Sequence, residues 1–163
     1  MAVRNCAEIG ENLIKIVNRL MSNDDLVKYL YYNDKEPLDH VALTNEEKQQ
    51  KVFEKLIKIV PRVGPKETAN SIIAIRVTRA NRLDSNVEFK RVRVEIEVFV
   101  PLTQWIIKGT NLRPFAILGE IQKSLDGKTI NGLGKMVGGD FQLNFLTEEI
   151  GCYEQVFEIV SYD

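Results

Sequence analysis

The side chains best suited to chemistry are few in this chain of 163 residues. It contains one histidine, His40, and two cysteines, Cys6 and Cys152, which lie near opposite ends. A nucleophile and base pair or a zinc site needs several such groups close together, and one histidine with no CxxC motif does not supply them. We therefore predict that the protein is not an enzyme, with no catalytic residue, no metal site and no cofactor. The two cysteines are expected to be free thiols.

The glycine-rich stretch INGLGKMVGGDF (residues 130–141) is the other candidate, because glycine-rich loops can cradle phosphate groups. It lacks the GKS or GKT ending of a P-loop, and it lies between a predicted helix and a predicted strand. Glycines of a turn or a β-bulge are therefore the preferred interpretation.

The strongest pattern in the chain is the alternation in EFKRVRVEIEVFV (residues 88–100). Every second residue from Val92 to Val100 is aliphatic, which predicts a half-buried strand with one apolar and one charged face. The charged face needs water or partners of opposite sign, and Glu154 and Glu158 of a later strand could pair with its arginines. Mixed charges at this spacing also suit a contact between identical subunits of a ring. The candidate subunit-contact residues are Arg91, Arg93, Glu95 and Glu97.

Periodicity predicts the elements around this strand. Helices are expected at four places, over residues 7–21, 25–32, 45–53 and 112–126. Strands are expected at four places, over residues 71–80, 88–100, 141–145 and 153–160. The run KLIKIV (residues 55–60) fits either a continued helix or an extended segment.

The order helices, hairpin, helix, hairpin is typical of an α+β fold. We predict an antiparallel sheet of about four strands with helices packed on one face. A single domain is expected to span residues 1–163, with a mainly helical part over 1–60 and a sheet with one long helix over 71–163. The surface loops 60–67 and 132–139 are the expected contacts with other proteins.

Composition argues against several classes of partner. The 22 Lys+Arg and 23 Asp+Glu give a net charge of −1, so no overall field attracts nucleic acid or an anionic membrane. No apolar run reaches the length of a signal peptide or a membrane span, so we expect synthesis in the cytoplasm. A basic group lies on the first predicted hairpin, where few aromatic residues accompany it, so we expect it to make cross-strand or intersubunit pairs. It consists of Arg76, Arg79, Arg82, Lys90, Arg91 and Arg93.

The C-terminal block, from Ser71 to Asp163, resembles a known group of proteins. VRVEIEVFVPLTQWII, RPFAILGEIQKSLDG and GGDFQLNFLTEEIGCYEQVFEIVSYD are similar to the tail terminators and head-tail joining (neck) proteins of tailed bacteriophages. The resemblance implies a structural protein of the virion tail or neck. Its copies would form a ring, a hexamer, that caps the tail tube, stops its polymerisation and joins it to the head.

The implied partners are further copies of the chain, the tail tube protein and the neck or head connector proteins. No membrane and no specific nucleic acid is implied, although DNA can pass through such a ring. Two alternatives remain open at this point. The first is a head-tail connector, either a neck adaptor or a stopper protein, and the second is a nucleic-acid-binding accessory protein.

Overall fold

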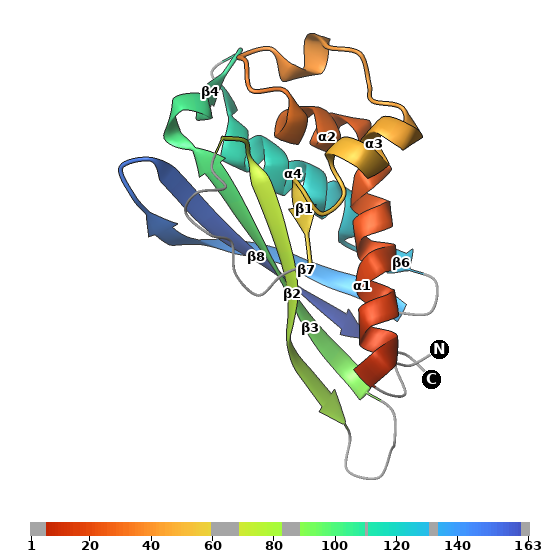
Figure 1. Cartoon of the computed structure of the whole chain (residues 1–163). Coiled ribbons are helices and arrows are strands. Elements are labelled where there is room, and N and C mark those ends of the chain that lie inside the picture. The colour runs from red at the N-terminus through yellow and green to blue at the C-terminus, as the bar shows by residue number, and fades with distance from the viewer. Residues whose placement is uncertain (1–5, 60–68, 83–88, 110, 131–133, 161–163) are drawn as a thin grey trace.

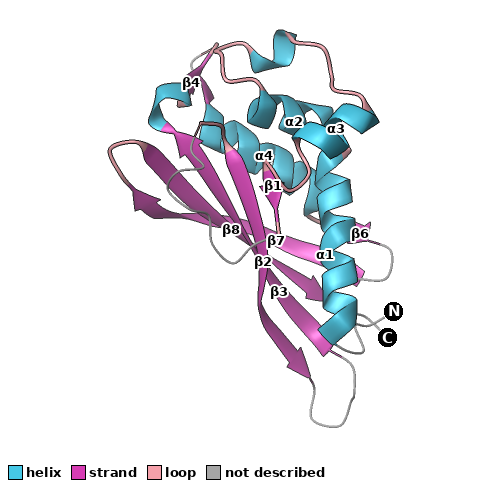
Figure 2. Ribbon diagram, in the orientation of Figure 1, coloured by secondary structure: helices cyan, strands magenta, loops and turns pink. Residues whose placement is uncertain are grey.

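The computed structural model describes residues 6–59, 69–82, 89–109, 111–130 and 134–160 (Figure 1). Within these ranges the structure is α+β, with helices gathered on one side of a curved sheet (Figure 2). The predicted loop over residues 60–67 falls outside the described part, as do residues 131–133 of the glycine-rich stretch. Every helix in the described part is too short or too polar to span a lipid bilayer.

The main sheet has six strands and is curled into a half-barrel. In order across the sheet they are β1 (Ile57–Lys58), β2 (Ile72–Arg82), β3 (Phe89–Pro101), β8 (Ile150–Val160), β7 (Gly134–Leu146) and β6 (Thr129–Ile130). Strand β1 runs parallel to β2, and all other neighbours are antiparallel, so the sheet is mixed.

The predicted antiparallel sheet of about four strands is therefore wrong. The sequence pattern left residues 55–60, where β1 forms, open between a helix and an extended segment. It missed β6, because a strand of two residues is too short to show alternation. It also missed a separate two-stranded sheet of β4 (Ile106–Ile107) and β5 (Asn111–Leu112). The simple order of helices, hairpin, helix, hairpin does not include these elements.

Four α-helices and two 3₁₀ turns complete the described chain. They are α1 (Cys6–Met21), α2 (Asp24–Tyr31), η1 (Pro37–Asp39), α3 (Asn45–Lys51), η2 (Leu102–Gln104) and α4 (Arg113–Leu125). A capping box begins α3, because Thr44 Oγ1 accepts a hydrogen bond from the Glu47 backbone N–H and the Glu47 carboxylate accepts one from the Thr44 backbone N–H. The helix ends at Lys51, before the predicted Phe53, and part of KLIKIV then forms β1.

One hydrophobic core fills the space between the helices and the sheet. The aliphatic face predicted for residues 88–100 is confirmed, since its side chains from Val92 to Val100 are at most 3% exposed. Side chains of α1 and α4 cover that face, including the fully buried Ile16 and Ile121. Burial of these aliphatic side chains is the main source of stability for the fold.

Arg113 joins the helical part to the sheet part, although it is fully buried and pairs with no carboxylate in the described chain. Its Nε donates to the Gln104 carbonyl at 3.0 Å, and its Nη1 donates to the carbonyls of Tyr29 at 2.6 Å and Tyr32 at 2.8 Å. Its Nη2 donates to the Asp34 carbonyl. Burial lowers the pKa of this guanidinium, and the nearby Asp34 opposes that shift.

Candidate functional site

An ionic cluster occupies the face of the sheet opposite the helices. It consists of Arg76, Arg93, Glu95, Glu97 and Glu154, and we call these five residues the ionic cluster. The strand register brings them together, because Arg76 of β2 lies opposite Glu95 of β3, and Glu97 of β3 lies opposite Glu154 of β8.

Arg76 is the centre of the ionic cluster. Its Nη1 lies 2.9 Å from Glu97 Oε2, its Nε lies 3.3 Å from Glu95 Oε2, and its Nη2 lies 3.8 Å from Glu154 Oε2. Arg93 adds a second guanidinium, with its Nε 3.2 Å from Glu95 Oε1. The sequence named Arg93, Glu95 and Glu97 as candidates, and the structure brings these three together around Arg76.

The three glutamates are buried, which sequence reasoning did not predict. They are 6 to 9% exposed, although no helix of the described residues covers this face. Neutral donors satisfy further oxygens, since Thr78 Oγ1 donates to Glu95 at 3.0 Å and Asn144 Nδ2 donates to Glu97 at 2.8 Å. A buried carboxylate is stable only with such partners, so these contacts hold β2, β3 and β8 together. Arg93 Nε is the exception, because it lies 3.2 Å from Glu95 Oε1 without forming a hydrogen bond.

Two neighbouring groups have shifted proton affinities. Burial, and then repulsion from Glu95, raises the pKa of Glu154, while Arg76 opposes the shift. Burial, together with the charge of Glu97, raises the pKa of the Cys152 thiol to about 12. Cys152 is therefore protonated near neutral pH and is a poor nucleophile.

Arg91, the fourth candidate residue, lies apart from the ionic cluster. Its Nε is 3.5 Å from Glu158 Oε2, and the two side chains are 60% and 44% exposed. The predicted cross-strand pairing of Glu158 with an arginine of β3 is confirmed by this contact, whereas Glu154 pairs with Arg76 of β2. A subunit contact through Arg91 or Arg93 stays a prediction.

A second feature is the outer half of β7, residues Asp140–Leu146, which we call the β7 arm. The sequence pattern treated Phe141, Leu143 and Phe145 as one strand face, but the apolar side chains of the β7 arm remain 41 to 61% exposed. They are Phe141, Leu143, Phe145 and Leu146. Strand β8 borders one side of the β7 arm, while β6 pairs with β7 only at Gly134 and Lys135. The other side of the β7 arm therefore faces no strand of the described chain.

The glycines before the β7 arm act as predicted. The ladder between β7 and β8 shifts register between Gly138 and Asp140, and both Gly138 and Gly139 have positive φ angles. A Cβ atom on Gly138 would lie 2.6 Å from the carbonyl oxygen of Val156. These glycines therefore form a β-bulge and not a phosphate cradle.

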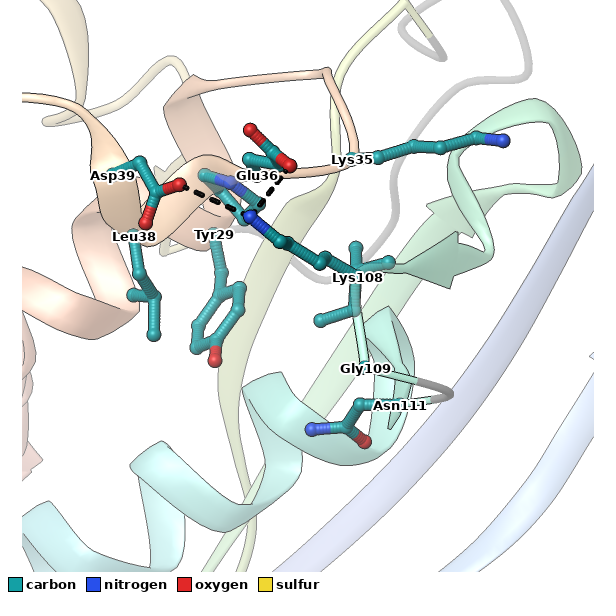
Figure 3. Close-up of a pocket in the computed structure, with 10 residues that line it drawn as sticks. Tyr29, Lys35, Glu36, Leu38, Asp39, Lys108, Gly109 and Asn111 are labelled. Atoms are coloured by element: carbon teal, nitrogen blue, oxygen red, sulfur yellow. Dashed lines mark ion pairs between the residues drawn. The ribbon is translucent and has the colours of Figure 1, made fainter.

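A pocket of about 350 Å³ lies between η1 and the β4–β5 sheet (Figure 3). Two lysines line this pocket, Lys35 and Lys108. Lys108 has its Nζ 2.8 Å from Glu36 Oε1 and 3.8 Å from Asp39 Oδ2. The two carboxylates already balance the ammonium group. Among the residues that the structure describes, no group of three His, Cys, Asp or Glu side chains could hold a metal ion.

Comparison with known proteins gives a family. The model of the YomW family matches residues 23–159, which is most of the chain. The chain belongs to the YomW family. YomW is a family of Bacillus phage regions, so this YomW protein is phage-related. The matched range includes the whole ionic cluster and the β7 arm, and no curated protein matches the chain.

Proposed function

We propose that this YomW family member is a non-enzymatic structural protein of a tailed phage particle, namely a tail terminator. In this role its copies form a ring of about six subunits that caps the tail tube and joins it to the head or neck. The partners are other copies of the chain, the tail tube protein and the neck proteins. The protein is located in the assembled virion.

The observation that carries the proposal is an open curved sheet in a protein of a phage family. The sheet ends at the β7 arm, which exposes four apolar side chains and a free strand edge among the described residues. Soluble monomers cover or charge such edges, because an exposed apolar edge recruits other chains. If further copies of the chain pair with this open edge, each copy extends the sheet of its neighbour, which is the kind of contact that can close a ring.

The ionic cluster supports a structural role better than an enzymatic one. Its three carboxylates are held by two arginines and by neutral donors, and the thiol beside them is protonated. An acid or base catalyst needs a group that can reach a substrate. The glutamates of this cluster are 6 to 9% exposed and bonded to neighbouring strands.

The test is the mass of the purified protein in solution, alone and mixed with the tail tube protein of the same phage. Light scattering gives the mass, and negative-stain microscopy shows rings and their position on tubes. We expect rings on the ends of tubes and no further growth of capped tubes. A protein that stays monomeric and leaves tube growth unchanged would refute the proposal.

A phage that lacks the gene separates a terminator from a connector. Without a terminator, tubes grow past their normal length, because nothing stops the addition of subunits. Without a connector, tails of normal length accumulate apart from filled heads. The first result supports the proposal, and the second supports a neck adaptor or stopper role.

A further inference from the structure

We propose that the β7 arm of one copy pairs edge to edge with β2 of a second copy, so that the sheets of neighbouring copies join head to tail. This inference rests on the proposed ring and names the surfaces that form it. It replaces a contact through the charged face with a contact through the two edges of the sheet.

The β7 arm is exposed on both faces as well as at its edge. Leu143 lies opposite Tyr153, on the side of the sheet that bears the helices, and is 52% exposed. Phe145 contacts the Phe99 ring on the other side, with centroids 5.9 Å apart, and is still 41% exposed. Figure 1 shows the tip of the β7–β8 hairpin far from α1, α2 and α3. Both faces of the arm therefore need a cover from outside the described chain.

The opposite edge of the sheet offers a matching strand. Strand β1 pairs with β2 only at Ile73 and Ala74, so the rest of β2, from Ile75 to Arg82, borders no other strand of the described chain on that side. The three ladders from β2 to β3, β8 and β7 are all antiparallel. Strands β2 and β7 therefore run in opposite directions. A copy placed head to tail continues the alternation with an antiparallel pair of β7 and β2.

Charge decides which edge of the second copy meets the β7 arm. From residue 136 to residue 149 the chain has three acidic residues, Asp140, Glu148 and Glu149, and no lysine or arginine. Two arms side by side would bring these acids together. The exposed Arg79 lies on β2, opposite Arg93 of β3, so the arm and β2 are complementary in charge.

The two charges also lie on the same face. Asp140 pairs in register with Val156, which lies opposite Glu95, so Asp140 is on the side of the sheet that carries the ionic cluster. Arg79 lies opposite Arg93 and is on that side too. Antiparallel pairing that sets the β7 arm, residues 140–146, against residues 75–81 of the free part of β2 places Asp140 of one copy opposite Asn81 of the next. Arg79 is then the diagonal neighbour of Asp140 on the same face, within reach of its long side chain.

Disulfide cross-linking between two variants tests the contact. One protein carries Asp140→Cys, the other carries Asn81→Cys and an affinity tag, and both carry Cys6→Ser to remove the exposed native thiol. Residues opposite each other on antiparallel strands have Cα atoms about 4.5–5.5 Å apart, which a disulfide can span. We expect the mixed proteins to form a covalent heterodimer on mild oxidation. Lys123→Cys, on the exposed face of α4, replaces Asn81→Cys in the control and should give none.

Each outcome decides for or against the contact. A heterodimer from Asp140→Cys with Asn81→Cys supports it. A homodimer from Asp140→Cys alone would indicate arm-to-arm pairing and overturn it, as would the absence of any cross-link in a concentrated mixture. Thermal unfolding of each variant before oxidation confirms that the monomer is folded.

Charge exchange gives a second readout that separates this inference from the proposed function. Asp140→Arg should reduce the oligomer mass, and adding Arg79→Asp in the same chain should restore it. If rings form equally well with Asp140→Arg alone, the proposed contact between the β7 arm and β2 is refuted, while the terminator role is unaffected. If the expected cross-link forms but the protein never caps tubes, the terminator role is refuted, while the proposed contact between the β7 arm and β2 is supported.

Discussion

Replacement of Arg113 should destabilise the protein more than replacement of any exposed arginine. Its guanidinium donates to four backbone carbonyls, and two of them, from Tyr29 and Tyr32, lie at the C-terminal end of α2. A methionine at this position keeps much of the volume but donates no hydrogen bond. The substitution Arg113→Met therefore leaves these carbonyl oxygens in a dry interior without their charged donor.

The size of the effect follows from those bonds. A hydrogen bond to a charged group contributes about 1.5–3 kcal/mol, and Arg113 makes four such bonds to carbonyl oxygens. The removal of a desolvated charge offsets part of that loss, so we expect Arg113→Met to lower the free energy of unfolding by about 3 kcal/mol. Arg113→Lys keeps a charge but cannot reach acceptors on several sides, so it should cost about 1–3 kcal/mol.

Urea unfolding of the variants measures these differences. Hydrogen exchange should show where the loss falls, with faster exchange at the end of α2 and in the chain up to Asp34. The matched control is Arg91→Ala, because that side chain is 60% exposed and should change stability by less than about 0.5 kcal/mol. An Arg113→Met protein within 1 kcal/mol of the wild type would refute the role of Arg113 as the link between the two parts.

Four further substitutions test the packing and the ionic cluster. Because the pKa of Glu154 is raised, the folded chain binds more protons than the unfolded chain at pH values between the ordinary and the raised pKa of this carboxyl. The free energy of unfolding therefore falls as pH rises through that window. Glu154→Gln should flatten this fall and add up to about 1 kcal/mol at neutral pH, as measured by urea unfolding at several pH values. Gly151→Ala would place a Cβ 2.4 Å from ring carbons of Trp105, so it should lower the free energy of unfolding by about 1–3 kcal/mol and change the tryptophan fluorescence. In the matched control Gly119→Ala, the new Cβ meets nothing within 4 Å, and the free energy of unfolding should rise by about 0.5–1 kcal/mol. Arg93→Glu adds a fourth carboxylate to the ionic cluster and should lower the free energy of unfolding by about 1 kcal/mol, and an unchanged urea midpoint would contradict the cluster geometry.

The sequence pattern predicted local structure well where a strand or helix was long. The alternation over residues 88–100 identified the buried face of β3 and the charged face opposite it, and the structure agrees. Register could not be predicted, because which residues face each other depends on bulges in partner strands. Arg76 was therefore recognised as basic but not as the partner of Glu154.

Alternation also says which side chains share a face but not what covers that face. Phe141 and Leu143 have the spacing of a core strand, yet each is 52% exposed because β7 extends to a sheet edge. Glu95 and Glu97 have the spacing of a solvated face, yet they are buried beneath their arginine partners. In both cases burial depends on neighbouring strands and on the curl of the sheet, which periodicity does not contain.

The burial of the glutamates narrows the choice of subunit contact. A ring contact through Glu95 or Glu97 would require an arginine of the next copy to displace Arg76, whose Nη1 lies 2.9 Å from Glu97. Separation of a buried ion pair costs several kcal/mol, and a partner must repay that cost before it gains any affinity. Exposed groups carry no such cost. The contact therefore falls to Arg79 and the β7 arm, where charge and apolar surface are already exposed in the single chain.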